Sequence, residues 1–385
     1  MAIIAAAACL ACLLLIGLLH RHFTSVATSW SISPTSHVRK GPGNTYQQSY
    51  QLTNEMAPKV QTSPDKRIEI GVQIENIYDL SMKDRVFKVE GWYWLKWPEL
   101  INTIIKENGI QQEKLIELTN QVDSDNLLVE TEQPNPERLS DGKYWQIFHF
   151  SGTFYIDKLR LSAFPFVELT LPVGLELGPD LLSCYPGNKY GCIGLDTDQN
   201  TNNHILGQYA DINGYTLLGA EIKEYLHQYA TNFGYTKPGA NSAVTVHILY
   251  HSNCSAAFWA YIFPLLILIG IAIMSPSLPG SLGDVRLAIP TTILLTLIFL
   301  QIGYKTDLPA MDYVSYLDWL YIYAYFVSGV LFLLFCWSTN LHAKACNDNN
   351  EGKAIRSIRR VDMMVQSCAF VGLLLALGSG LLFQP

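Results

Sequence analysis

Four long apolar runs in the last third of the chain limit its fold more than any other feature of the sequence. They cover residues 256–274, 287–304, 319–339 and 363–383, and none of them contains a charged residue. A helix needs about 20 mostly apolar residues to cross the hydrocarbon core of a bilayer. We therefore predict four transmembrane helices, which form a membrane domain over residues 253–385.

The second of these runs is the one that could line water. It carries more hydroxyl groups than its neighbours, at Thr291, Thr292 and Thr296. Side chains that recur at intervals of four, three, four and three share one face of a helix, and here these are Ala288, Thr292, Leu295, Phe299 and Ile302. From the pattern alone, packing of this face against a neighbouring helix is the better interpretation.

The distribution of charge divides the chain into a water-exposed part and a membrane part. Charged residues make up 15% of the sequence, and they gather in residues 54–160 and become sparse beyond residue 250. This contrast predicts two domains. The net charge of −7 argues against a general nucleic-acid-binding protein.

Basic residues predict how the chain crosses the membrane. The segment 338–360 holds five of them, Lys344, Lys353, Arg356, Arg359 and Arg360. Positive loops stay in the cytoplasm, so we expect 338–360 to be a short cytoplasmic loop. The N-terminal domain then lies outside the cell or in the periplasm, and the protein is a multi-pass protein of the cell membrane.

The first 65 residues are expected to export the outer domain across the membrane and to connect to it through a linker. Residues 2–19 are apolar, so segment 1–27 is either a signal peptide cleaved after Ala27 or an uncleaved anchor. Residues 28–65 are rich in Ser, Thr, Gln, Pro and Gly and are typical of a flexible linker.

Residues 66–252 have the pattern of a β-sandwich. Segment 68–77 alternates apolar and polar residues, 78–84 reads as a turn, and 86–97 resumes the alternation, which predicts a hairpin. Further strands are expected at 144–156, 167–177, 215–225 and 243–250, with one helix at 98–118. The predicted fold class is an extracellular, immunoglobulin-like β-sandwich followed by a four-helix transmembrane bundle.

Cys184 and Cys192 are the only cysteines of this outer domain, and a turn-rich segment separates them. An exported domain permits a disulfide between them. Two unpaired thiols or a metal pair are the alternatives, but no His or acid lies between them at ligand spacing. The sequence also lacks the phosphate-loop, zinc-protease and nucleophile-elbow motifs, so we expect neither an enzyme nor a cofactor.

Several motifs occur in a characteristic order. The aromatic strand ends in Trp97-Pro98-Glu99, and Phe164-Pro165-Phe166 follows. Pro264 lies in the first apolar run, and Leu308-Pro309 follows the second, with Tyr313 and Asp318 beyond it. In this order and spacing, residues 66–385 resemble the pentameric ligand-gated ion channels, the Cys-loop receptor superfamily.

The chain departs from that family at three places. Asp157 and Leu171 stand where animal members have the two cysteines of the Cys-loop. Val167 replaces an aspartate, and His251 or Ser252 replaces a basic residue before the first membrane helix. The resemblance is therefore to a prokaryotic-type subunit that lacks the Cys-loop disulfide, with altered gating.

The resemblance implies a homopentamer, in which four identical subunits join the chain around a pore lined by the second membrane helix. It places Ala288, Thr292, Leu295, Phe299 and Ile302 at the pore, where the last three form an apolar constriction. Asp284 would form an acidic ring that attracts cations, although a helix N-cap is an equally good use of this residue. Pro290 either kinks the helix or lies in its first turn.

The resemblance also implies an agonist site and a gating interface. A small-molecule agonist or protons would act between adjacent outer domains, at Trp92, Trp94, Tyr225, Phe233 and Tyr235, although aromatic residues in a sandwich mostly form core. The gating interface would comprise Asp79, Asp84, Phe164, Pro165, Phe166, Lys305, Asp307 and Pro309. Lys305 and Asp307 would exchange partners with Asp79 or Asp84. The alternative function is a non-conducting, membrane-anchored β-sandwich sensor.

Overall fold

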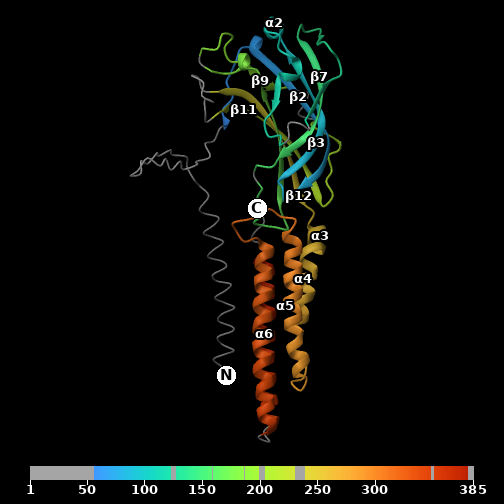
Figure 1. Cartoon of the computed structure of the whole chain (residues 1–385), viewed down its shortest axis with the longest axis vertical. Coiled ribbons are helices and arrows are strands. Elements are labelled where there is room, and N and C mark those ends of the chain that lie inside the picture. Colours follow the sequence, from blue (N-terminus) through green and yellow to red (C-terminus); the bar gives the residue numbers. More distant parts are fainter. Residues whose placement is uncertain are drawn as a thin grey trace, which may run out of the picture. The chain divides into compact units, whose positions relative to one another are not determined.

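The structure is a computed structural model that describes residues 56–122, 127–157, 159–185, 187–198, 204–229, 239–347 and 351–379 (Figure 1). It consists of two compact units. The sheet unit holds the described residues up to Leu159 together with Glu168–His251. The helical unit holds Arg160–Val167 and the described residues from Ser252 onward. The predicted leader 1–27, and the linker up to residue 55, lie outside the described residues.

The predicted β-sandwich is confirmed in the sheet unit. Its strands are β1 (Met56–Ala57), β2 (Arg67–Ser81), β3 (Val86–Trp97), β4 (Ile116–Leu118), β5 (Leu128–Thr131), β6 (Glu137–Arg138), β7 (Tyr144–Tyr155), β8 (Glu168–Leu177), β9 (Gly194–Thr197), β10 (Leu206–Tyr209), β11 (Tyr215–Gln228) and β12 (Ala240–Ser252). One sheet has the order β1-β11-β12-β8-β4, and the other has the order β10-β2-β3-β7-β5, with β6 paired to β7 and β9 paired to β2. Apolar side chains of both sheets meet in one core.

Alternation of apolar and polar residues explains the central hairpin. Ile68, Ile70, Val72 and Ile74 of β2 are fully buried, while the residues between them face outward. In β3 every second residue from Phe87 to Trp97 is likewise buried. The predicted turn at 78–84 is wrong in its start, because β2 continues to Ser81 and the chain reverses over residues 82–85.

Two other expectations for this unit need correction. Residues 98–118 do not form one helix: α2 (Glu99–Glu107) is followed by a 3-10 turn, η2 (Gln112–Lys114), and then by β4. Residues 56–65 are not a free linker, because β1 pairs with β11. The Lys59 ammonium also pairs with the carboxylates of Glu224 and Asp196. Without β1, this edge of β11 would have free backbone hydrogen-bonding groups, and β1 pairs with them. The composition of residues 56–65 could not predict this pairing.

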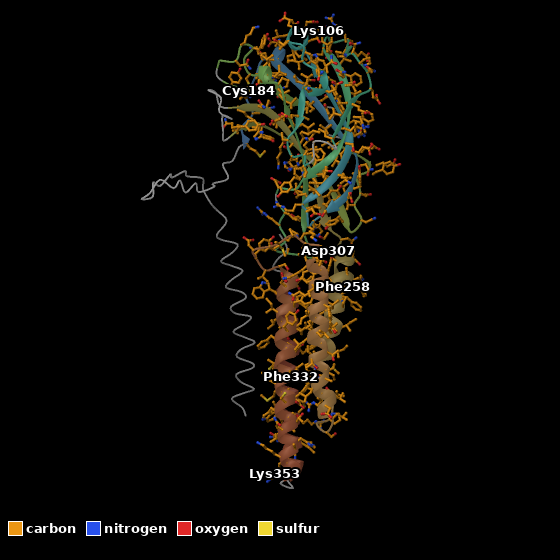
Figure 2. All side chains as sticks on the ribbon, in the orientation of Figure 1. Lys106, Cys184, Phe258, Asp307, Phe332 and Lys353 are labelled. Carbon is orange, nitrogen blue, oxygen red and sulfur yellow. A yellow bond between two sulfur atoms is a disulfide. The ribbon has the colours of Figure 1, made fainter. Side chains whose placement is uncertain are left out.

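The predicted disulfide between Cys184 and Cys192 is confirmed (Figure 2). It closes a short loop after β8 and the 3-10 turn η4 (Asp180–Leu182). Replacing both cysteines by serine should lower the free energy of unfolding by about 2.5 kcal/mol, because the open loop gains entropy in the unfolded chain. Denaturant unfolding of the native chain and the double variant measures this difference. A reductant should destabilise the native chain by more than the variant, which keeps the disulfide of Cys368; an equal loss of stability in both chains would contradict the assignment.

The helical unit contains four helices that are long and apolar enough to span a membrane, which confirms the predicted multi-pass membrane architecture. The spans are Cys254–Ser277, Gly283–Lys305, Tyr316–Ala345 and Gly352–Gly378. The first consists of α3 (Cys254–Ala257), a π-helical segment η5 (Phe258–Ile262), α4 (Phe263–Met274) and a 3-10 turn η6 (Ser275–Ser277). The others are α5 (Gly283–Lys305), α6 (Tyr316–Asn347) and α7 (Glu351–Ser379). Figure 1 shows α4, α5 and α6 running beside one another.

Local chemistry explains where the first span begins and changes geometry. The Asn253 side chain caps α3 by accepting hydrogen bonds from the backbone N–H groups of Ser255 and Ala256, at 3.1 and 3.2 Å. Pro264 lies in the first turn of α4, directly after the π-helical segment. Because proline has no N–H group, the junction of two helical geometries is a position that tolerates it.

The expected loop 338–360 is largely helical. Helix α6 continues to Asn347 and α7 starts at Glu351, so Lys344 lies on α6 and the arginines lie on α7. Basic side chains have good helix propensity, and charge alone does not end a helix. The prediction identified the basic end of the helices correctly and wrongly assigned it to a loop.

Candidate functional site

Helix α5 has an exposed face that contains every residue predicted to line a pore. Asp284, Ala288 and Thr292 are exposed at the first half of the helix. Leu295, Phe299 and Ile302 are 55%, 65% and 55% exposed along the second half. These six residues therefore form one stripe, which we call the α5 stripe, and packing within the helical unit does not cover it.

The opposite face of α5 is packed, mainly against α6. Its buried residues are Arg286, Pro290, Ile293, Leu297 and Tyr304. Pro290 therefore lies inside the helix on the packed side, which contradicts a place in the first turn. The Thr291 hydroxyl donates to the carbonyl of Ala288 at 2.8 Å, near the position where proline removes a backbone hydrogen bond. The stripe thus faces away from the helix that holds α5 in place.

Asp284 lies in the first turn of α5, and its side chain does not cap the helix. The N-cap residue is Leu282, which makes no side-chain cap hydrogen bond, so the N-cap interpretation of Asp284 is wrong. A carboxylate in the first turn is nevertheless favourable, because it faces the positive end of the helix dipole. The Thr292 hydroxyl donates to the carbonyl of Ala288 at 2.9 Å, which leaves its oxygen lone pairs on the exposed side.

A buried ion pair joins three helices at the same end of the unit. The Arg286 guanidinium is 1% exposed, and its Nη2 lies 2.7 Å from Asp362 Oδ2 on α7. Its Nη1 donates to Ser338 Oγ at 3.1 Å, and the group lies 4.4 Å from the ring centroid of Phe335 on α6. A buried charge needs such partners. Sequence reasoning missed Asp362. The available signal was a single acidic residue directly before an apolar run, which indicates a carboxylate with a buried partner.

A second polar network lies at the other end of α5. The Asp318 carboxylate on α6 accepts a hydrogen bond from the Tyr304 hydroxyl and another from Ser315 Oγ at 3.0 Å. Lys305 Nζ lies 3.0 Å from the same carboxylate. The predicted gating residue Lys305 therefore pairs within its own unit, while Asp307 and Pro309 lie in the connection that follows α5.

The other predicted gating acids have partners within the sheet unit. Asp79 Oδ2 accepts a hydrogen bond from Lys88 Nζ at 2.6 Å. The Asp84 carboxylate accepts one from Ser81 Oγ at 2.7 Å. Both pairs are exposed, so each contributes little to stability. Exchange of partners between Lys305 or Asp307 and these two acids stays a prediction.

The Phe164-Pro165-Phe166 loop packs onto the ends of the membrane helices, inside the helical unit. The Phe164 ring centroid lies 5.0 Å from that of Tyr261 and 6.0 Å from that of Tyr304. The Phe164 carbonyl accepts a hydrogen bond from the backbone N–H of Leu317 at 3.1 Å. Phe166 lies 6.5 Å from the Tyr316 ring, so residues of this loop contact aromatic side chains of the first, second and third spans.

The predicted agonist residues of β3 lie on the outer face of their sheet. Tyr93 is buried in the core, while Trp92 and Trp94 are half-buried on the other side, so the core interpretation is wrong for these two. The Trp92 ring centroid lies 4.7 Å from that of His149, whose Nε2 is 3.2 Å from Glu90 Oε1.

The Trp94 side chain already has a hydrogen-bond partner within the sheet unit. Its Nε1–H donates to Asp198 Oδ2 at 2.9 Å, and Lys96 Nζ lies 2.7 Å from the same oxygen. Asp198 is 4% exposed, and a buried carboxylate needs hydrogen-bond donors such as these two. Trp92 is therefore the better candidate for contact with a ligand.

The outer face of the other sheet carries a polar cluster that sequence reasoning missed. The Glu176 carboxylate on β8 is 1% exposed, lies 2.6 Å from His227 Nδ1 and accepts a hydrogen bond from the Tyr229 hydroxyl. The predicted agonist residue Tyr225 lies beside His227, with 6.3 Å between ring centroids. Glu176, one of two carboxylates in the otherwise apolar strand 167–177, was the available signal. Phe233 and Tyr235 lie outside the described residues.

Glu117 of β4 adds a second carboxylate to this face, directly across from Glu176 in the strand register. Burial, together with the negative charges of Glu176 and Asp180, raises the pKa of the Glu117 carboxyl above its ordinary 4.5. The ionised form of Glu117 is thus disfavoured in the folded chain. Among the described residues, no group of three or more His, Cys, Asp or Glu side chains could hold a metal ion.

Replacing Glu117 by Gln should raise the melting temperature at pH 7 by removing this penalty. The penalty is fully present above the raised folded-state pKa and disappears below the ordinary value of 4.5, where Glu117 is protonated in both states. Thermal unfolding of both chains across this pH range measures the effect. The gain should shrink as the pH falls and vanish below 4.5; a gain of constant size would contradict the assignment.

No protein-family model matches the chain, and a comparison with curated proteins finds no relative. Over the residues that the structure describes, a β-sandwich precedes four helices long and apolar enough to span a bilayer, which supports a multi-pass membrane protein.

Proposed function

We propose that the chain is one subunit of a homopentameric ligand-gated ion channel of the Cys-loop receptor superfamily, of the prokaryotic type without the Cys-loop disulfide. The observation that carries this proposal is the α5 stripe. The chain's own packing holds the opposite face of α5 and leaves the stripe uncovered. The stripe begins with Asp284 and includes Thr292, and an acid is costly against lipid. A face of this kind suits water better than hydrocarbon.

Five copies of α5 around one axis would turn the stripe into rings of side chains. Leu295, Phe299 and Ile302 would form an apolar constriction that stops ions by excluding water. A ring of Asp284 carboxylates would attract cations, and the outward lone pairs of Thr292 are suited to contact with them. The proposed channel therefore passes cations.

The orientation follows from charge. The basic residues at the end of α6 and the start of α7 favour a cytoplasmic location for that end of the helices. The sheet unit and the connection after α5 then lie outside the cell or in the periplasm.

The agonist is proposed to act between sheet units of adjacent subunits. Ring assembly joins different faces of neighbouring copies. Each outer face carries an imidazole that contacts both a carboxylate and an aromatic ring: His149 with Glu90 and Trp92, and His227 with Glu176 and Tyr229. Aromatic rings beside carboxylates can hold a small cationic molecule, and imidazoles can take up protons. Both kinds of agonist are therefore chemically supported.

Recording from the purified chain in a planar bilayer tests the proposal. Discrete single-channel currents are expected, and they should depend on pH or on a small-molecule agonist. Unequal salt concentrations on the two sides then report the preference for cations through the reversal potential. Silent bilayers, under acidification and with a library of amines, would reject the channel in favour of the non-conducting sensor.

A further inference from the structure

Cys368 of α7 is joined in a disulfide to a cysteine outside the described residues. Four of the other cysteines are not available as its partner. Two of them bond to each other, namely Cys184 and Cys192. Two more form no disulfide, namely Cys254 and Cys336. The partner of Cys368 is therefore one of the three that remain, which are Cys9, Cys12 and Cys346.

The packing of α6 on α7 excludes Cys346. The Tyr323 hydroxyl of α6 donates a hydrogen bond to the carbonyl of Ala369, the residue next to Cys368. Cys346 lies more than six turns beyond Tyr323 in the same helix, or about 35 Å along its axis. The two Cα atoms of a disulfide lie within about 7 Å of each other. Only the two cysteines of the apolar segment 2–19, Cys9 and Cys12, remain.

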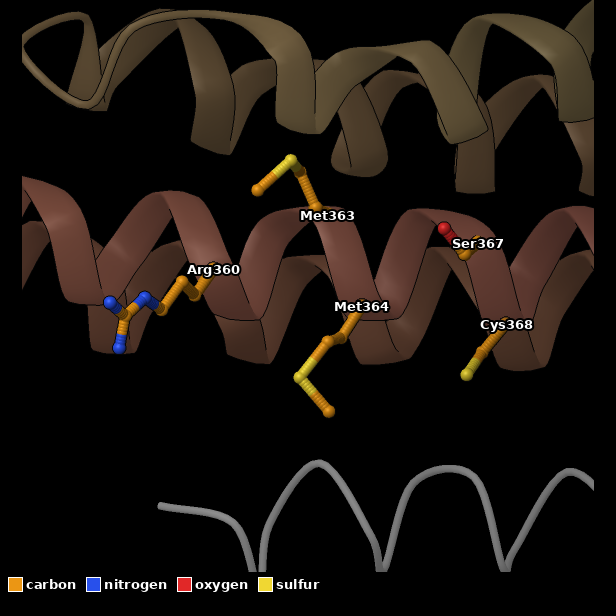
Figure 3. A pocket seen from close by; sticks show the side chains of 5 residues that line it. All are labelled: Arg360, Met363, Met364, Ser367 and Cys368. Atoms are coloured by element: carbon orange, nitrogen blue, oxygen red, sulfur yellow. The ribbon is translucent and has the colours of Figure 1, made fainter.

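The surface of α7 around Cys368 is apolar and exposed. Three apolar residues share one helical face with Cys368: Met364, Val371 and Leu375. They are 50%, 54% and 47% exposed, so the other described helices leave this Cys368 face open. An open, mostly apolar pocket lies along it, lined by Arg360, Met363, Met364, Ser367 and Cys368 (Figure 3). In Figure 3 the side chains of Arg360, Met364 and Cys368 point to the same side of α7.

Segment 2–19 has the length and the side chains to cover this face. A helix over these residues would be about 27 Å long, close to the hydrocarbon core of about 30 Å. Ala5 and Ala8 would share one side of that helix with Cys9 and Cys12, so all four side chains on this side are small. Small side chains let two membrane helices approach closely, which a disulfide between helices requires.

We propose that segment 2–19 stays on the mature chain as a membrane anchor, lies along the Cys368 face of α7, and is joined to Cys368 by a disulfide from Cys9 or Cys12. The segment is then an uncleaved anchor, and not a signal peptide removed after Ala27. The bond forms by thiol–disulfide exchange with a disulfide donor of the export compartment. The two cysteine thiols become one disulfide, and the disulfide of the donor becomes two thiols.

The depth of the cysteines in the membrane agrees with this pairing. With the orientation proposed above, α7 runs outward from the cytoplasm, and so does an N-terminal anchor that leads to an outer domain. Cys368 and Cys9 each lie within about two turns of the cytoplasmic start of their apolar runs. Cys12 lies almost one turn further in. Parallel packing of the two helices therefore brings Cys9 closest to the level of Cys368.

Site-specific proteolysis of the full-length chain tests the proposal. A protease recognition sequence inserted after Gly43, in the linker, leaves the sequence around Ala27 intact and allows the N-terminal fragment to be cut off. The purified protein is treated with a thiol-blocking reagent and cut. It is then denatured and analysed by mass spectrometry without and with a reductant. The N-terminal fragment should begin at residue 1 or 2 and stay attached until the disulfide is reduced.

Cysteine variants identify the bond. Cys368→Ser should change the fragment from wholly attached to wholly released in the absence of reductant. Cys336→Ser is the matched control, because it removes a cysteine of α6 that forms no disulfide, and it should keep the fragment attached. Of Cys9→Ser and Cys12→Ser, one should behave as Cys368→Ser does and the other as the control. A cooperative melting transition in Cys368→Ser shows that this variant folds.

Three results would overturn the proposal. A mature native chain that begins at residue 28 would mean that the leader is a cleaved signal peptide, and lipid would then cover the Cys368 face. Release of the fragment from the native chain without reductant would mean that no such bond exists. A dimer that depends on Cys368 and separates on reduction would mean that a second copy supplies the partner. None of these results depends on whether the protein conducts ions.

Discussion

Replacing Arg286 by Met should lower the free energy of unfolding by about 3–5 kcal/mol, the largest stability effect that we expect for a single substitution in this chain. The substitution leaves the carboxylate of Asp362 buried without its cation, and it removes the bond to Ser338 and the contact with Phe335. These interactions join α5, α6 and α7, so their loss should loosen all three helices. Thermal unfolding of the detergent-solubilised chain measures the effect.

The double variant Arg286→Met with Asp362→Leu separates the buried charge from the general loss of packing. Apolar pairs often replace buried ion pairs without loss of stability, so the double variant should recover most of the melting temperature. Lys344→Met on α6 is a matched control, because it removes an exposed positive charge at the same end of the helices. A loss at Arg286 no larger than that at Lys344 would contradict the role of the ion pair.

Replacing Asp284 by Lys should reverse the ion preference of the proposed channel. The substitution changes a ring of five negative charges into a ring of five positive charges, at the end of the α5 stripe. With unequal salt on the two sides, the reversal potential should change sign. The fold should tolerate the substitution because the side chain is exposed, although a lysine in the first turn loses the favourable interaction with the helix dipole.

Asp312→Lys is the control for this experiment. Asp312 is also an exposed acid, but it lies in the connection between α5 and α6, away from the stripe. Its substitution makes the same change in net charge and should leave the sign of the reversal potential unchanged. Equal behaviour of the two variants would show that Asp284 does not border the ion path.

The parts of the fold that sequence reasoning predicted well are those governed by local periodicity. Alternation from Ile68 to Trp97 has one stable solution, a hairpin with one buried face, and the structure has it. The lengths of the apolar runs likewise predicted the four spans. A helical spacing placed Ala288 to Ile302 on one face, but the pattern alone favoured packing of that face, and the structure leaves it exposed.

The parts that sequence reasoning missed depend on contacts between distant segments. Glu176 meets His227 and Tyr229 because strand pairing brings β8 and β11 to the same outer face, and no local pattern encodes that meeting. Asp362 lies far from Arg286 in sequence, and only helix packing brings them together. The Phe164 loop was recognised as a motif, but its place in the helical unit follows from ring contacts with Tyr261 and Tyr304.

The most direct test of the account is the reactivity of a cysteine placed at Leu295, compared with one placed at Leu297. Leu295 is 55% exposed on the α5 stripe, and Leu297, two residues away, is fully buried on the opposite face. With the exposed Cys254 replaced by serine in every chain, a charged, membrane-impermeant thiol reagent should modify Leu295→Cys and block its current. It should leave Leu297→Cys and the Cys254→Ser background unaffected. If Leu295→Cys stays unreactive in conducting or agonist-treated protein, the stripe faces lipid or a sister helix, and the proposed pore does not exist.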